Sequence, residues 1–198
     1  MLRTENIEYG NYYHIFNKGI NGTNLFQSDK DYLHFLTLYK YYITEVADTY
    51  AYCLLKNHFH LLVKIKEKDK IKHIPDRTDK RYNPSRQFAH LFNAYAQTFN
   101  HQNKRTGTLF DRSFKRKHID SKEYFVNLIV YIHNNPVHHG FIEEITNYKW
   151  SSYYAYVTDK QTNIKKEEVL NMLEDIDNFK YLHKIKQDYT LIEKYIIE

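Results

Sequence analysis

"TYAYCLLKNHFHLLVKIK", residues 49–66, is the stretch that decides the fold. Two runs rich in aromatic, β-branched and other apolar residues flank Lys56-Asn57, a natural turn or break, so the stretch predicts two consecutive strands. Residues two apart on a strand point to the same face. Phe59 would therefore face the core, while His58 and His60 project together from the other face of the same strand.

Strand and helix signals continue on both sides of this pair of strands. The expected elements are a strand at 12–19, a helix that Ser28 or Asp29 caps and that runs through 32–47, a charged exposed loop at 66–85, a helix at 86–105 opened by Ser85, a short strand within 106–120 and a helix at 121–140. The order β-α-β-β-α-β-α is a split βαβ unit with one additional helix. The sequence thus predicts an α+β fold: a ferredoxin-like four-stranded antiparallel sheet with helices on one face.

Length and composition restrict the class of protein. A chain of 198 residues can form one domain with a core. We expect residues 1–158 to form the main domain and residues 159–198 a helical C-terminal extension that packs on it or mediates contacts. The single cysteine, Cys53, cannot form an internal disulfide. With no long apolar run and no signal-like N-terminus, a cytoplasmic protein without a membrane partner is expected.

The charge is positive and unevenly distributed. The net charge is +5, and 20 tyrosines accompany 12 phenylalanines. Basic side chains attract phosphates and aromatic faces stack on bases, although many tyrosines would simply fill the core. Residues 159–198 hold nine acids and seven lysines, so the positive charge belongs to residues 1–158. A nucleic-acid surface is therefore expected in the first four-fifths of the chain.

His58 and His60 form the only His-x-His pair among 12 histidines. They are either two metal ligands or two solvated, hydrogen-bonded side chains. Tyr131 and Asn135 are four residues apart on a predicted helix and so share one face. The Asn135 amide oxygen could complete a metal site beside the Tyr131 phenol; alternatively, Tyr131 is a core residue and Asn135 ends the helix before Pro136.

Cations concentrate between residues 101 and 118, where six lysines and arginines accompany one acid. Such a run is either a solvated face or a set of phosphate contacts. The candidates are Lys104, Arg105, Arg112, Lys115, Arg116 and Lys117, with Lys18 as a weaker one. Among the other histidines, His133 would face away from Tyr131, and His14 and His34 lack any partner pattern and would be structural.

Four segments resemble a known family in their order and separation: "NHFHLLV", "FNAYAQTFNHQNKRTGTLFDRSFKRKHID", "YIHNNPVHHGF" and "YKWSSYYAY". They resemble the IS200-like tyrosine transposases, most closely the branch associated with repetitive extragenic palindromes (REPs). The resemblance covers residues 12–156. One departure is Lys56, where such proteins often have proline.

The resemblance implies an HUH endonuclease core in which His58 and His60 bind a metal, Asn135 completes the metal site and Tyr131 is the nucleophile. It implies a metal-dependent enzyme that nicks and joins single-stranded DNA near hairpins through a 5′-phosphotyrosine, using Mg²⁺ or Mn²⁺ and no nucleotide cofactor. Such a protein would be a monomer or a homodimer at the bacterial nucleoid. A non-catalytic or domesticated nucleic-acid-binding protein on the same fold stays open, as does hydrolysis by a metal-bound water.

Overall fold

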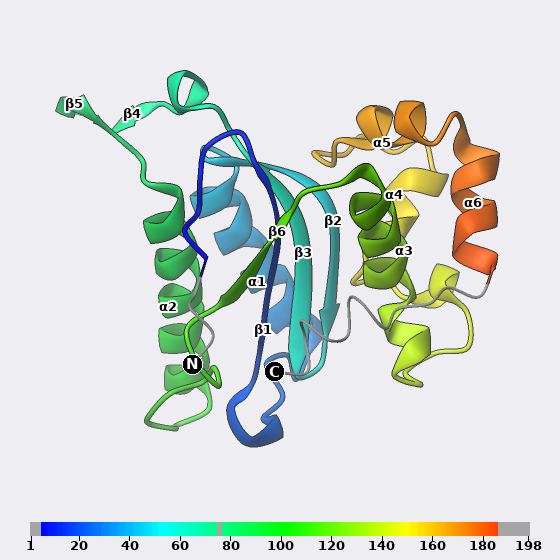
Figure 1. Ribbon diagram of the computed structural model, residues 1–198. Coiled ribbons are helices and arrows are strands. Elements are labelled where there is room, and N and C mark those ends of the chain that lie inside the picture. Colours follow the sequence, from blue (N-terminus) through cyan, green and yellow to red (C-terminus); the bar gives the residue numbers. More distant parts are fainter. Residues whose placement is uncertain (1–4, 75–76, 186–198) are drawn as a thin grey trace.

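The centre of the molecule is a four-stranded antiparallel sheet with strand order β2-β3-β1-β6 (Figure 1). The computed structural model describes residues 5–74 and 77–185. The sheet strands are β1 (Tyr12–Lys18), β2 (Ala47–Leu55), β3 (His58–Ile65) and β6 (Lys115–Ile119). The first and third strands lie in the middle, as in a split βαβ fold. The predicted ferredoxin-like sheet is confirmed.

Helices cover both faces of this sheet, whereas the sequence predicted them on one face. Figure 1 shows α1 (Asp29–Ile43) and α2 (Pro84–Gln102) on one side of the strands and α3 (Lys122–His138) on the other. The cause lies in the central strands, because Phe59, Leu61 and Leu62 of β3 are all buried. Strands with apolar residues on both faces need cover on both faces.

Local capping explains where the helices begin. Ser28 caps α1 in a capping box with Asp31, and Ser121 accepts the Tyr124 N–H at the start of α3. For α2 the predicted opening at Ser85 is wrong by two residues. Asn83 is the N-cap and accepts the Arg86 N–H at 3.0 Å, with a proline following as the first helical residue.

Helix ends differ more from the prediction. α1 ends at Ile43 rather than near Ala47, because Ala47 already pairs with Ile65 in the sheet. α3 continues past Asn135 and through Pro136 to His138, so Asn135 lies inside the helix rather than ending it. A proline removes only one backbone hydrogen bond, and near a helix end the last carbonyls have no intrahelical donor in any case.

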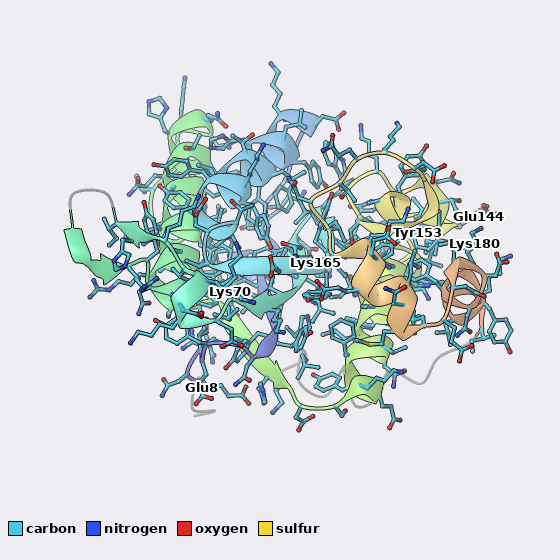
Figure 2. All side chains as sticks on the ribbon, turned by 90° about the horizontal axis from the view of Figure 1, so that it is seen from above. Glu8, Lys70, Glu144, Tyr153, Lys165 and Lys180 are labelled. Atoms are coloured by element: carbon cyan, nitrogen blue, oxygen red, sulfur yellow. The ribbon has the colours of Figure 1, made fainter. Side chains whose placement is uncertain are left out.

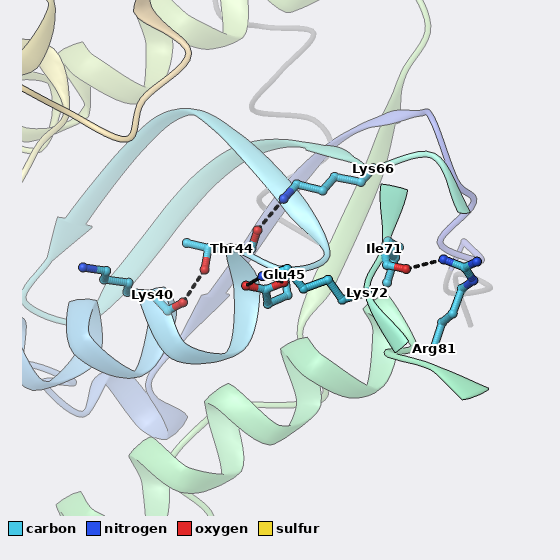
Figure 3. Close-up of polar contacts among 7 residues, drawn as sticks. All are labelled: Lys40, Thr44, Glu45, Lys66, Ile71, Lys72 and Arg81. Carbon is cyan, nitrogen blue, oxygen red and sulfur yellow. Dashed lines mark hydrogen bonds and ion pairs between the residues drawn. The ribbon is translucent and has the colours of Figure 1, made fainter. Parts of the chain in front are cut away.

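The charged stretch 66–85, expected to be an exposed loop, contains a small hairpin. Lys72 forms an ion pair with Glu45 at 3.1 Å, and Arg81 donates to the Ile71 carbonyl (Figure 3). The sequence of residues 66–85 has no alternation of apolar and polar residues that would predict strands. The short elements of this part and of the loops are η1 (Ile20–Gly22), η2 (Lys68–Lys70), β4 (His73–Ile74), β5 (Arg77–Arg81) and η3 (Ile145–Asn147).

The C-terminal segment packs on the core through three helices, α4 (Tyr153–Val157), α5 (Lys166–Met172) and α6 (Ile176–Lys184). Val169, Leu173 and Phe179 are buried in the same cluster as the inner face of α3. Tyr153, labelled in Figure 2, stacks on Phe179 with ring centroids 5.7 Å apart. Of the extension predicted at 159–198, residues 159–185 thus contribute α5 and α6 to the core, whereas α4 lies before that boundary. Residues 186–198 lie outside the described residues.

A buried chain of hydrogen bonds joins α6 to α3. The His183 Nδ1–H donates to the Phe179 carbonyl (2.7 Å), which leaves His183 Nε2 to accept from the His133 Nδ1–H (2.9 Å). His133 Nε2 then accepts from the Ser152 hydroxyl (2.8 Å). Burial lowers the pKa of His183 to about 4 and that of His133 well below its ordinary value. Both rings are therefore neutral, structural side chains at pH 7.

No helix within residues 5–74 and 77–185 is both long enough and apolar enough to cross a membrane.

Candidate active site

The four residues that the sequence pointed to lie together on the α3 face of the sheet. His58 Nε2 is 3.1 Å from Asn135 Oδ1, and the His58 and His60 rings are 5.2 Å apart. The Tyr131 ring meets the His60 ring edge-on with centroids 5.5 Å apart. One chain therefore brings its own strand histidines and its own α3 side chains to a single site.

The alternation of side chains along β3 and the helical spacing along α3 explain why these four residues lie together. On β3, Phe59 packs into the cluster beneath α1 and α2, so His58 and His60 project from the opposite face. On α3, Leu128, Ile129 and Ile132 are buried in the cluster that fixes this helix against the sheet. Residues one helical turn apart share a face, so Tyr131 and Asn135 point toward the same strand end.

His58 lies between two amide oxygens. Its Nδ1 is 2.8 Å from Asn57 Oδ1, and its Nε2 faces Asn135 Oδ1. Burial, with a smaller contribution from His139, lowers the pKa of His58 to about 4, so the ring is neutral at pH 7. A neutral imidazole has one N–H to donate. When His58 Nδ1–H donates to Asn57, the Nε2 lone pair and the Asn135 oxygen face one another as two Lewis bases.

His60 is buried and has a partner that the sequence did not reveal. Its Nδ1 lies 2.9 Å from Nε2 of His14, which is completely buried on β1. The sequence showed no partner pattern for His14, which was expected to be structural; the structure gives it His60 as a partner. Adjacency of the first and third strands follows from the fold, but the register that brings His14 beside His60 is not visible in the sequence. Burial, followed by the neighbouring His14 and His58, lowers the pKa of His60 well below its usual range.

Two polar atoms at this site lack hydrogen-bond partners among the described residues: His60 Nε2 and Asn135 Nδ2, both buried. In the same ranges, three or more His, Cys, Asp or Glu side chains nowhere form a group that could hold a metal ion. The available donor set is thus two imidazoles and one amide. Imidazole nitrogen with amide oxygen suits a divalent ion that keeps open positions for other ligands.

A cavity of about 190 Å³ opens beside these side chains. Tyr131 is 3% exposed and forms part of the cavity wall. The cavity also has a cationic side. Its lining residues are Phe16, Asn17, Lys18, Asn57, His58, His60, Asp111, Arg112, Lys115, Tyr131 and His139.

The predicted cations separate into two groups. Lys18, Arg112 and Lys115 line the cavity. The other four do not line the cavity. Lys104 lies in the turn after α2 with a positive φ, and Arg105 donates to Asn100 Oδ1 and to the Thr108 carbonyl. Arg116 donates to the Glu5 carbonyl, and Lys117 pairs with the Glu5 carboxylate at 2.9 Å.

The four-stranded antiparallel sheet and its helices match the HUH tyrosine transposase fold. The structure is similar to that of the REP-associated tyrosine transposase solved bound to a REP hairpin, with a TM-score of 0.55 and 16% identity. This match covers 78% of the present chain and 86% of that chain.

Sequence comparison supports the same resemblance. Over 112 residues the chain is 30% identical to a Haemophilus influenzae protein described as "Putative REP-associated tyrosine transposase". The match covers 56% of this chain and 61% of that protein, so it spans less than two thirds of the curated relative. No family model matches the chain. The predicted resemblance to the REP-associated tyrosine transposases is confirmed by both comparisons.

Proposed function

We propose that the protein is a metal-dependent endonuclease and strand transferase that acts on single-stranded DNA near hairpins. The observation that carries the proposal is the position of Tyr131, whose ring lies against His60 in a cavity that His58 and Lys115 also line. The H. influenzae relative is described as a tyrosine transposase, and the solved neighbour was bound to a hairpin. Both descriptions support this activity and this kind of partner.

The proposed metal ligands are His58, His60 and Asn135. Their chemistry fits, because both imidazoles are neutral at pH 7, and because His60 Nε2 and Asn135 Nδ2 are both buried without a hydrogen-bond partner among the described residues. Mg²⁺ or Mn²⁺ would act as a Lewis acid that stabilises charge on the phosphate and on the leaving oxygen. A nucleotide cofactor has no role in the proposal, because transesterification conserves the phosphodiester bond energy.

In the proposed reaction the Tyr131 oxygen forms a bond to phosphorus while the bond from phosphorus to the 3′ oxygen breaks. The phenol gives up its proton, the leaving 3′ oxygen gains one, and the products are a 5′-phosphotyrosine and a free 3′-OH. A phenol has a pKa of about 10 and therefore needs a cationic environment to react as an anion near pH 7. Lys18, Arg112 and Lys115 line the same cavity and would provide it while binding the DNA phosphates.

The test is covalent capture of the DNA fragment on the correct side of the nick. Hairpin-containing single-stranded DNA labelled at either the 5′ or the 3′ end is incubated with the protein and Mn²⁺, then run on a denaturing gel. The 3′-labelled fragment should migrate with the protein, the 5′-labelled fragment should run free, and EDTA should prevent both products.

Two alternative functions give different gels. Cleavage without any protein-linked fragment would mean hydrolysis by water and would contradict the phosphotyrosine. Retention of the hairpin in a native gel with no cleavage in Mg²⁺ or Mn²⁺ would instead identify a non-catalytic or domesticated binding protein on this fold.

The two faces of β6 provide a further prediction for DNA binding. Lys115→Ala should weaken binding of single-stranded DNA and reduce the slope of log K against log[salt] by about one. Arg116→Ala should leave that slope unchanged, because Arg116 lies on the opposite face of β6, with its guanidinium 5.0 Å from the centroid of the Phe114 ring. Titrations in increasing KCl measure both slopes, and equal slopes for the two variants would contradict this assignment of the surface.

A further inference from the structure

We propose that His14 is a positioning residue that accepts a hydrogen bond from His60 and thereby keeps the His60 Nε2 lone pair available to a divalent cation. This inference rests on the proposed metal site. It concerns a residue that the sequence motifs do not include, on a strand that carries none of the proposed ligands.

The geometry holds the two rings in one arrangement. β1 and β3 are adjacent antiparallel strands, and His14 and His60 project from the same face. The Phe16 ring stacks on His14 at 4.5 Å and on His60 at 6.0 Å. Because His14 and His60 are 0% and 1% exposed, water does not compete for the hydrogen bond between them.

Proton positions distinguish two states of this pair. Each neutral imidazole carries one hydrogen, and only one hydrogen lies in the bond between His14 Nε2 and His60 Nδ1. If His14 donates, the hydrogen of His60 is on Nε2, and this nitrogen is closed to a cation. If His60 donates, its Nε2 carries no hydrogen and has a lone pair available, and the hydrogen of His14 is on Nδ1.

Neither state satisfies every atom. His14 Nδ1 and His60 Nε2 both lack hydrogen-bond partners among the described residues and are buried. Each tautomer therefore buries one N–H without an acceptor, and neither has an evident advantage in the absence of a cation. A cation at His60 Nε2 removes this balance, because it requires the state in which His60 donates to His14. His14 is then the acceptor that orients the ligand, as outer partners of metal-bound histidines generally do.

The first experiment compares His14→Leu with His14→Gln in the full chain. Leucine removes the acceptor, whereas glutamine keeps a carbonyl oxygen that can accept from His60 Nδ1–H. Mn²⁺ affinity, measured by the EPR signal of free Mn²⁺, should fall by about 10- to 100-fold in His14→Leu and by much less in His14→Gln. His118→Leu is the matched control, since His118 is a strand histidine on the opposite face, next to Tyr13. Wild-type affinity in His14→Leu would overturn the proposal.

The second experiment needs no variant and so does not depend on the folding of one. Nitrogen-15 NMR of the wild-type histidines in Mg²⁺ should show His60 with its proton on Nδ1 and His14 with its proton on Nδ1. A Mg²⁺-dependent shift at His58 and His60 with the His14 proton on Nε2 would overturn the positioning role alone. No shift at either histidine would contradict the metal site and the present inference together, while the adduct test of the proposed function remains a separate result.

Discussion

Replacing Tyr131 by phenylalanine should abolish the covalent protein–DNA adduct and lower strand cleavage by about 10³-fold or more. The change removes one oxygen and keeps the ring, which packs against His60 with centroids 5.5 Å apart in the cluster beneath α3. The fold and the proposed metal site should therefore persist, so the loss of reaction can be attributed to the nucleophile. Quantifying adduct and cleaved strand on the same denaturing gel measures both effects.

Tyr124→Phe is the matched control for this variant. Tyr124 lies two turns earlier on α3 and does not line the cavity, so its variant should form the adduct at the wild-type level. Cleavage that continues without an adduct in Tyr131→Phe would show that water, rather than the phenol, attacks the phosphate. Mn²⁺ binding by Tyr131→Phe, measured separately, should equal that of the wild type, because the phenol is outside the proposed ligand set.

Acidification from pH 7 to pH 4 should greatly reduce the stability of the metal-free protein. Burial lowers the pKa of His183 from 6.5 to about 4, so between these values the unfolded chain binds a proton that the folded chain does not. The free energy of unfolding therefore falls as the pH drops through this window. His183 alone would contribute a loss of roughly 3 kcal/mol, and His133, whose pKa is lowered in the same buried chain, would add to it.

Urea unfolding at a series of pH values in EDTA tests this expectation. The His183→Gln variant should be less stable than the wild type at pH 7, because the acceptor for His133 is changed. Its stability should then depend less steeply on pH between 6.5 and 4, because one titrating group is gone. Parallel pH curves for the two proteins would contradict the assignment of this acid sensitivity to His183.

The parts of the fold that the sequence predicted correctly are those governed by local rules. Alternation along residues 58–65, a helix start at Ser28 or Asp29 and the order of strands and helices are read from neighbours along the chain. The proximity of Tyr131 to His60 was implied by the family resemblance, because spacing alone places two residues on one helix face without saying which strand that face meets.

The parts that could not be predicted depend on pairing across the sheet. His14 meets His60 only through the register of β1 against β3. Arg116 and Lys115 belong to one run of cations, yet strand alternation turns them to opposite faces once the limits of β6 are known. The end of α1 was missed because β pairing at Ala47 outweighs the helical spacing that precedes it.

The chain of side chains from Ser152 through His133 to His183 also bears on how two copies could exchange α3. If α3 alone were exchanged, His133 of one copy would meet Ser152 and His183 of the other, so the same hydrogen bonds would form between the copies. Before that, the exchange would have to expose this buried chain and the apolar cluster that contains Val169 and Phe179. The packing of α3 therefore slows the exchange of the tyrosine helix, whereas it does not disfavour the exchanged dimer once that dimer has formed.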